Sequence, residues 1–260
     1  GWIMPMRLSR ASASLNSVSP TVRVGAAIHS VRAVEPAEIE IVAAWAAAHD
    51  APLHAHVSEQ PAENEQCLDA YGMTPTALLA QRGALGDRFT AVHATHVNDT
   101  DLALLGDARS TVCLCPTTER DLADGIGPAR AMRDAGARLA LASDSHAVID
   151  LFEEARAVEL DERLATNVRG HHDAASLLRA ASEGAHASIG WPEAGRIEVG
   201  ALADFVSVRL DSVRTAGTDD QSALEAAVFA AAAADVHHVV VGGRTVVSDG
   251  AHATMDVAES

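Results

Sequence analysis

The sequence predicts an α/β fold built on a parallel β-sheet, of the (β/α)8 TIM-barrel type. Five strand-like patterns alternate with helical patterns between residues 21 and 167, as in parallel sheets with helical crossovers. None of these strands is followed by a G-x-G-x-x-G turn, the fingerprint of a nucleotide-binding open sheet. Residues with chemically active side chains stand where different strands end, which is where such a barrel builds its active site. They are His29, His56, His93 and Asp144.

The predicted elements follow one another in short strand–helix units. Strands are expected at 21–28, 52–57, 89–94, 111–115 and 137–143, where apolar residues cluster. Helices are expected at 36–49, 63–71, 76–82, 99–107, 129–135 and 149–167, with Pro36 and Gly72 at typical helix boundaries. The segment 116–119 after the fourth strand is expected to be a loop. A barrel needs eight strands, so five visible strands mean either an incomplete barrel or an open sheet.

The pattern changes after residue 167. We expect a helix at 173–187, short β segments at 195–200 and 203–208, and an alanine-rich helix at 222–235. Residues 238–241 and 244–247 flank Gly242-Gly243, which is the pattern of a β-hairpin. The expected division is therefore an irregular leader at 1–20, the barrel segment at 21–190 and a smaller β-rich segment at 191–260.

Composition excludes several classes of function. With 19 basic and 36 acidic residues the formal charge is −17, which argues against nucleic-acid and anionic-membrane partners. No apolar run reaches the ~20 residues that a membrane span needs. The three cysteines lack zinc-site spacing and fit reduced thiols in a cytoplasmic protein. The chain has no lysine, which excludes Schiff-base chemistry on that side chain.

The segment L-H-A-H-V-S-E-Q at 53–60 carries the clearest chemical signal. An apolar strand delivers His56, and Glu59 follows three residues later. A neutral imidazole is a good zinc ligand, and a nearby carboxylate is well placed to move protons for an activated water. An H-x-x-E pair alone is weak, because such pairs also occur on solvated surfaces. Because other strands also end at a histidine or an aspartate, the metal-binding interpretation of His56 is the stronger one.

Several segments together carry a resemblance to a known family. They are H-S-V-R-A-V at 29–34, H-A-H-V-S-E-Q at 54–60, V-H-A-T-H at 92–96, C-P-T-T-E at 115–119 with D-G at 124–125, S-D-S-H at 143–146, and the tail G-R-I-E-V-G-A-L-A-D-F-V at 195–206. With these segments the chain resembles the deaminase branch of the amidohydrolase superfamily over about residues 22–252. H-S-V-R-A-V and C-P-T-T-E make it most similar to the formimidoylglutamate deiminase family.

The resemblance implies a role for each strand-end residue. It implies Zn²⁺ as the cofactor, with Fe²⁺ or another divalent metal as alternatives, and a small dicarboxylate as substrate. Metal ligation is implied for His56 and Asp144, catalysis for Glu59, His93 and Asp144, and substrate binding for His29 and Arg32. A supporting or undecided role is implied for His54, His96, Thr118, Glu119 and His146, with Thr118 and Glu119 expected in a loop over the site.

Ordinary structural roles compete with these interpretations. Glu59 could be a surface carboxylate, Asp144 a helix N-cap, and Arg32 the partner of a surface acid such as Glu35. His96 fits a loop or helix-capping role about as well as a functional one. Cys113 and Cys115 alternate on a buried strand and are expected to be packing residues.

One part of the family pattern is not found. Such enzymes take two zinc ligands from an H-x-H on the first barrel strand, and no histidine precedes His29. The visible strands correspond to the fourth to eighth, so we expect the first three strands and part of the accessory β-sandwich to be absent. With two of four ligands missing, the chain alone is expected to hold little zinc.

Three functional hypotheses follow. The first is zinc-dependent hydrolysis of N-formimino-L-glutamate to N-formyl-L-glutamate and ammonia in histidine degradation, with a homodimer as one option for the assembly of the enzyme. The second is a deaminase or chlorohydrolase acting on a purine- or pyrimidine-like ring, although only 3% of residues are aromatic. The third is a non-catalytic fragment that serves as an interaction module.

Overall fold

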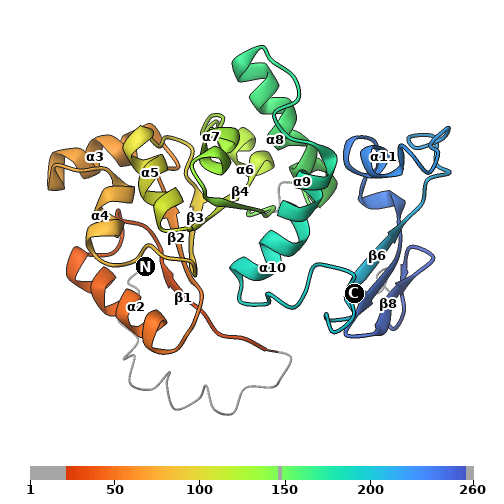
Figure 1. Cartoon of the computed structure of the whole chain (residues 1–260), viewed down its shortest axis with the longest axis horizontal. Coiled ribbons are helices and arrows are strands. Elements are labelled where there is room, and N and C mark those ends of the chain that lie inside the picture. Colours follow the sequence, from red (N-terminus) through yellow and green to blue (C-terminus); the bar gives the residue numbers. More distant parts are fainter. Residues whose placement is uncertain (1–21, 146–147, 256–260) are drawn as a thin grey trace.

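Five parallel strands form the main sheet of the computed structural model, which describes residues 22–145 and 148–255. Their order in the sheet is β1-β2-β3-β4-β5, the same as in the chain, and every neighbouring pair is parallel. The strands are β1 (Ala26–Ile28), β2 (Leu53–Val57), β3 (Phe89–His93), β4 (Thr111–Leu114) and β5 (Arg138–Leu141). The predicted succession of parallel strands is confirmed, and Figure 1 shows the helices that connect them.

The connecting helices begin at residues that favour a helix start, namely prolines in the first turn and capping side chains. They are α2 (Pro36–Ala48), α3 (Pro61–Tyr71), α4 (Pro75–Gln81), α5 (Asp99–Asp107), α6 (Pro116–Asp121), α7 (Ala129–Asp134) and α8 (Leu151–Thr166). A proline, which has no backbone N–H to leave unpaired, occupies the first turn of α2, α3, α4 and α6. Asn98 forms a capping box with Asp101 at α5, and Asp150 caps α8.

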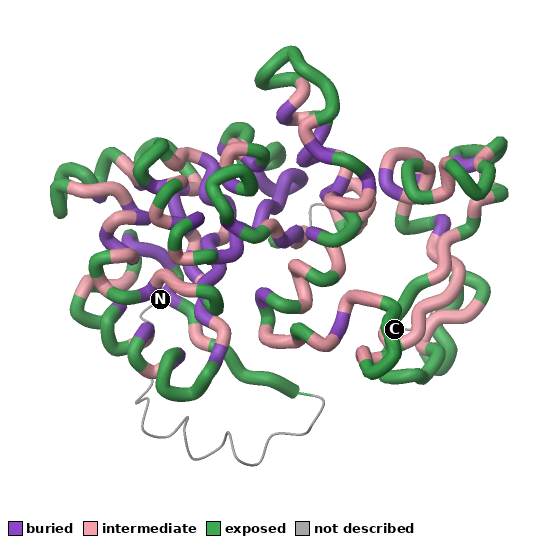
Figure 2. The backbone as a smooth tube through the Cα atoms, viewed as in Figure 1, coloured by how far each residue is buried: buried purple, intermediate pink, exposed green. Residues whose placement is uncertain are grey.

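The core lies between this sheet and its helices. Figure 2 shows burial concentrated on the strands and on the helix surfaces that face them. Every residue of β4 is buried, as expected for a parallel strand covered on both faces. The largest fully buried apolar side chains include Phe89 of β3, Ile39 of α2, Leu79 of α4 and Met132 of α7.

A helical stretch after α8 packs against the last strand of the sheet. It consists of α9 (Ala174–Arg179), the π-helical turn η1 (Ala180–Gly184) and α10 (Ala185–Ser188), which together match the helix predicted at 173–187. The approach to β5 is close at Gly184, where an added Cβ would lie 2.2 Å from the carbonyl oxygen of Leu139. Only glycine allows the two backbones to come this near.

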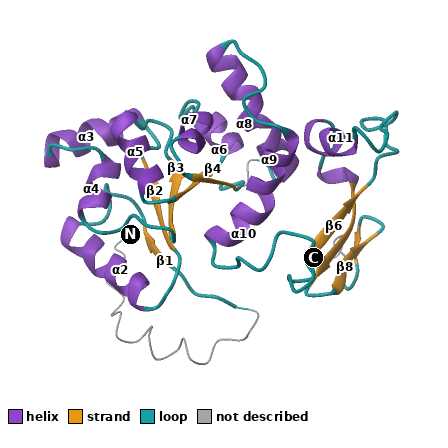
Figure 3. Cartoon of the chain, in the orientation of Figure 1, coloured by secondary structure: helices purple, strands orange, loops and turns teal. Residues whose placement is uncertain are grey.

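A second, antiparallel sheet follows, which contains the labelled strands β6 and β8 in Figure 3. The order of its strands is β6-β7-β8-β9. Its strands are β6 (Phe205–Val208), β7 (Val236–Val241), β8 (Arg244–Ser248) and β9 (Ala251–His252). The hairpin predicted around Gly242-Gly243 is confirmed, since β7 and β8 pair across it. None of the residues in these strands is fully buried. The small sheet therefore contributes little apolar core.

The alanine-rich helix is shorter than predicted. It spans α11 (Ala223–Phe229) and is followed by a separate 3-10 turn, η2 (Ala233–Asp235). It packs on α8 and α9, and its Val228 belongs to the core of the main sheet. Helix α11, in the predicted segment 191–260, thus shares the core of the predicted barrel segment 21–190. The predicted leader at 1–20 lies outside the described residues, and no helix in the described part is long and apolar enough to cross a membrane.

Candidate active site

Three histidine rings gather at one edge of the main sheet. His29 directly follows β1, His56 lies near the end of β2, and His93 is the last residue of β3. Because the strands are parallel, their carboxyl ends meet at the same edge. The ring centroids of His29 and His56 are 5.1 Å apart, and those of His56 and His93 are 5.6 Å apart. The structure therefore brings together the three histidines predicted at strand ends.

The orientation of His56 leaves one ring nitrogen available to a metal. Its Nδ1 lies 2.7 Å from the backbone oxygen of His29. A carbonyl oxygen only accepts hydrogen bonds, so Nδ1 must carry the proton. The lone pair is then on Nε2, and this arrangement is typical of metal-binding histidines, whose other nitrogen donates to a fixed acceptor.

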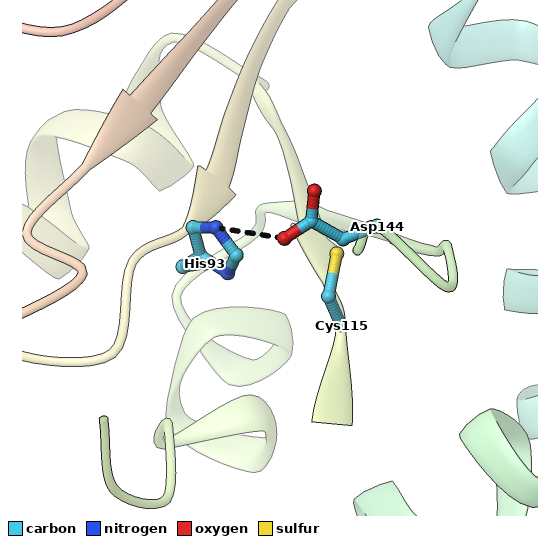
Figure 4. Close-up of side chains that lie close together, drawn as sticks. All are labelled: His93, Cys115 and Asp144. Carbon is cyan, nitrogen blue, oxygen red and sulfur yellow. Dashed lines mark ion pairs between the residues drawn. The ribbon is translucent and has the colours of Figure 1, made fainter. Parts of the chain in front are cut away.

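His93 is the most enclosed member of the group. Its side chain is fully buried, and Nε2 has no hydrogen-bond partner among the described residues. That nitrogen lies 3.8 Å from Oδ2 of Asp144 (Figure 4) and 3.8 Å from Oε1 of Glu59. His93 and Asp144 both adopt positive φ angles, 69° and 47°, which non-glycine residues seldom do. Such backbone conformations are concentrated at functional sites.

Three carboxylates surround His93 and decide its protonation. Burial by itself lowers the pKa of His93. The hydrogen bond to Glu119, together with the charges of Glu119, Glu59 and Asp144, outweighs burial, so the pKa is raised above its ordinary value. The same three carboxylates make the surroundings of His93 negative, which favours a positive charge there, either on the ring or on a bound cation.

The expectation that Thr118 and Glu119 lie in a loop is wrong. Both belong to α6 and are buried. Glu119 Oε1 accepts a hydrogen bond from Cys115 N at 2.8 Å and lies 3.2 Å from His93 Nδ1. Glu119 thereby holds the imidazole of His93, which makes it a positioning residue. Pro116 at the first helical position was the sequence signal for this helix.

Thr118 fixes the segment that carries Asp144. Its Oγ1 donates to the backbone oxygen of Ser143 at 3.0 Å and accepts from Ser145 N at 3.1 Å. These bonds anchor both neighbours of Asp144 to α6. The N-cap alternative for Asp144 is also wrong, because Asp150 caps the following helix α8.

Arg32 contacts a proposed catalytic carboxylate and not Glu35. Its Nη2 donates to Oε2 of Glu59 at 2.9 Å, and its Nε lies 3.8 Å from Oε2 of Glu63. The side chain of Arg32 is 33% exposed, so part of the guanidinium faces solvent. Burial raises the pKa of Glu63, which also accepts a hydrogen bond from Glu59 N. Sequence reasoning had not anticipated this pairing of Arg32 with Glu59.

Two other histidines have structural partners away from the group. The Nε2 of His54 lies 2.8 Å from the backbone oxygen of Ser188 and so ties β2 to α10. The Nε2 of His96 lies 2.6 Å from the backbone oxygen of Asp124. His96 does not cap α5, since Asn98 does so. His146 lies outside the described residues.

Comparison with known proteins identifies the family. The model of the amidohydrolase family matches residues 11–246, which is most of the chain. This chain belongs to the amidohydrolase family. A relative from Pseudomonas aeruginosa, named formimidoylglutamate deiminase, is 34% identical over 238 residues, covering 88% of this chain and 52% of the relative. A 5-methylthioadenosine/S-adenosylhomocysteine deaminase from Halobacterium salinarum is 30% identical, covering 85% of this chain and 51% of the relative.

Solved structures of amidohydrolase relatives show the same fold. A crystal structure of an adenosine deaminase from Xanthomonas campestris with bound zinc matches with a TM-score of 0.91 and 29% identity, over 97% of this chain and 58% of that chain. The five parallel strands thus belong to a fold of the TIM-barrel type. The chain spans about half the length of the curated relatives that it matches.

The donor atoms of the amidohydrolase site fit a zinc-type ion. The Nε2 of buried His93, which has no hydrogen-bond partner among the described residues, faces the carboxylate of Asp144. The ring of His56 lies on the neighbouring strand, with its Nδ1 held by the backbone oxygen of His29. Imidazole and carboxylate are ordinary zinc ligands. The thiol of Cys115 also lies within 4.8 Å of the donors of His93 and Asp144, a proximity that sequence reasoning missed. A hydrogen bond with Cys113 and burial raise the pKa of Cys115, which favours a protonated packing thiol.

Proposed function

We propose that this chain supplies part of the active site of a metal-dependent hydrolase that releases ammonia from N-formimino-L-glutamate. The observation that carries the proposal is the convergence of His56, Glu59, His93 and Asp144 at one edge of the sheet. Because the chain spans about half of its curated relatives, the proposal concerns the complete protein. The reaction adds water to the formimino carbon and gives N-formyl-L-glutamate and ammonia.

The residues of this chain have distinct roles in the proposed reaction. His56 and Asp144 would hold the metal, which when bound activates water as a Lewis acid. Glu59, 14% exposed and in contact with His93, is placed to accept a proton from the attacking water and deliver it to the departing nitrogen. Asp144 serves as a second proton acceptor. His93, held by Glu119, stabilises the charge of the tetrahedral intermediate that forms when water adds to the formimino carbon.

Arg32 is the proposed determinant of substrate class. Its guanidinium has five N–H donors, of which the structure uses one in a hydrogen bond, to Glu59. The remaining donors on the solvent-facing side are available to a substrate carboxylate, which arginine binds in bidentate geometry. His29, beside His56 at the same edge, completes the proposed grip on a dicarboxylate.

A second candidate is a deaminase acting on a purine-like ring. The Arg32–Glu59 ion pair favours it, because an arginine already paired to a carboxylate offers less charge to a substrate. Relatives with such names include an 8-oxoguanine deaminase from Pseudomonas aeruginosa, which is 31% identical over 240 residues, covering 91% of this chain and 53% of the relative. Neutral rings would leave the Arg32–Glu59 pair undisturbed.

Ammonia release distinguishes these candidates. The 260-residue chain, joined to the amino-terminal segment of the Pseudomonas aeruginosa formimidoylglutamate deiminase, would be offered N-formimino-L-glutamate, 5-methylthioadenosine and 8-oxoguanine. We expect turnover of the first. Arg32→Met should raise its KM roughly 10- to 150-fold, since a charge-assisted hydrogen bond contributes about 1.5–3 kcal/mol.

A matched control separates substrate binding from loss of charge. Arg82→Met removes an arginine of similar exposure that pairs with Glu40, away from the site, and should leave KM unchanged. Turnover of a ring substrate, with a KM that Arg32→Met leaves unchanged, would establish the second candidate instead. A folded chimera with neither turnover nor bound metal would support the non-catalytic hypothesis.

A further inference from the structure

A second cluster of metal-binding side chains lies in the small antiparallel sheet. It consists of His237 and His238 on β7 and Asp249 in the turn between β8 and β9. Each offers one ligand atom, and these atoms all lie within 4.8 Å of one another. Figure 1 places this sheet beyond α8, α9 and α10, apart from the strands that carry the proposed active site.

A β-bulge explains how two consecutive histidines can serve one site. In a regular strand, neighbouring side chains point to opposite faces. Here Val208 pairs with Val236 and Ser207 pairs with His238, so His237 is an extra residue in β7. A bulge of this kind places two residues opposite one and redirects their side chains. The rings of His237 and His238 consequently lie 4.1 Å apart.

A tight turn brings in the carboxylate. Asp249 and Gly250 have φ angles of 53° and 76°, and Ser248 pairs with Ala251 across them. Two positive φ angles in a two-residue loop are typical of a type I′ hairpin turn. The turn is docked on the bulge, because Gly250 N donates to the backbone oxygen of His237 at 3.0 Å. Asp249 Oδ1 then lies 2.9 Å from His237 Nε2.

His238 is held by a partner outside the cluster. Its Nδ1 lies 3.1 Å from Oγ of Ser207, and the same oxygen accepts a hydrogen bond from His238 N. Metal-binding histidines are commonly oriented by such a bond to the other ring nitrogen. An ordinary surface ion pair would account for His237 and Asp249, but it gives no reason for His238 to be fixed beside them.

We propose that His237, His238 and Asp249 form a second site for a zinc-type transition metal. Zinc bonds of ~2.0–2.2 Å place tetrahedral donors about 3.3–3.6 Å apart, so donors within 4.8 Å need only small side-chain adjustments. Two imidazoles exclude magnesium and calcium, which prefer oxygen ligands. Asp249 is 79% exposed, which leaves the site open to metal and to a completing water.

The metal would act as a cross-link within the small sheet. None of the residues of β6–β9 is fully buried, so these strands have little apolar burial to hold them together. A bound ion would join β7 to the β8–β9 turn. Metal binding to the folded state alone stabilises that state.

Calorimetric titration of the metal-free 260-residue chain with ZnCl₂ tests the proposal. The His56→Ala background removes a ligand of the other proposed site. In that background, Asp249→Asn and His238→Ala should each weaken zinc binding by roughly tenfold or more, because even loss of a ligand's hydrogen-bonding partner costs ~10–100-fold. Asp50→Asn is the matched control, since it removes a similarly exposed carboxylate that pairs with Arg88, just before β2 of the main sheet.

Paramagnetic broadening by Co²⁺ locates the ion independently of affinity. At substoichiometric cobalt, the imidazole resonances of His237 and His238 should broaden first, and those of the exposed His252 on β9 should persist longer. Equal weakening by Asp50→Asn and Asp249→Asn would overturn the proposal, because it would show diffuse electrostatic attraction. Zinc binding that is unaffected by both His238→Ala and Asp249→Asn would overturn it as well.

Discussion

Replacing Glu119 by glutamine tests whether this buried carboxylate holds His93. The carboxylate lies 3.2 Å from His93 Nδ1 and accepts from Cys115 N at 2.8 Å, and the side chains of Glu119 and His93 are 5% and 0% exposed. Glutamine keeps the shape and one acceptor oxygen but removes the charge. The lost charge-assisted bond corresponds to about 1.5–3 kcal/mol, or roughly 10- to 150-fold in an equilibrium or rate that depends on it.

The loss of stability should depend on pH. The pKa of His93 is raised in the folded metal-free protein, so its protonated form stabilises the fold fully below the unfolded pKa of about 6.5. This contribution is lost as the pH rises through the folded pKa. Glu119→Gln should therefore lower the free energy of unfolding more at about pH 6 than at about pH 9. It should also lower the pKa of His93 in an NMR titration.

Urea unfolding of the metal-free chain at both pH values measures this effect. Glu65→Gln is the control, since it makes the same change at an exposed position of α3. The reasoning is refuted if Glu119→Gln costs the same free energy at both pH values, or if the pKa of His93 does not move. In the chimera, the same substitution should lower kcat and shift the pH profile, which a merely structural role would not do.

Three further predictions concern stability and reactivity. Gly106→Ala should destabilise by about 1–3 kcal/mol in urea unfolding, because its Cβ would lie 1.9 Å from Ala135 O; a more stable variant would contradict the packing. Arg214→Met should destabilise near neutral pH and lose its effect in acid, since Arg214 holds the pKa of Asp235 well below its usual range; a pH-independent loss would contradict this. Burial raises the pKa of Cys67 to about 11, so Ellman's reagent should label it only after unfolding.

Local patterns were enough to place most of the main sheet. Strand and helix boundaries depend on residues next to one another, such as Pro36 at the start of α2 and Gly72 after α3. Since parallel strands end at one edge, the strand-end positions of His56 and His93 also predicted their proximity. The prediction was wrong at α6, where a short helix stands in place of the expected loop.

The sequence by itself determined where the strands lie along the chain and which strand ends carry histidine or carboxylate, because side-chain periodicity is a property of neighbouring residues. Only the tertiary structure decided how those groups pair. Glu119 with His93, Arg32 with Glu59 and Asp249 with His237 join residues that lie 26, 27 and 12 positions apart. Such contacts depend on how distant elements pack and on single backbone irregularities, and no local pattern encodes them.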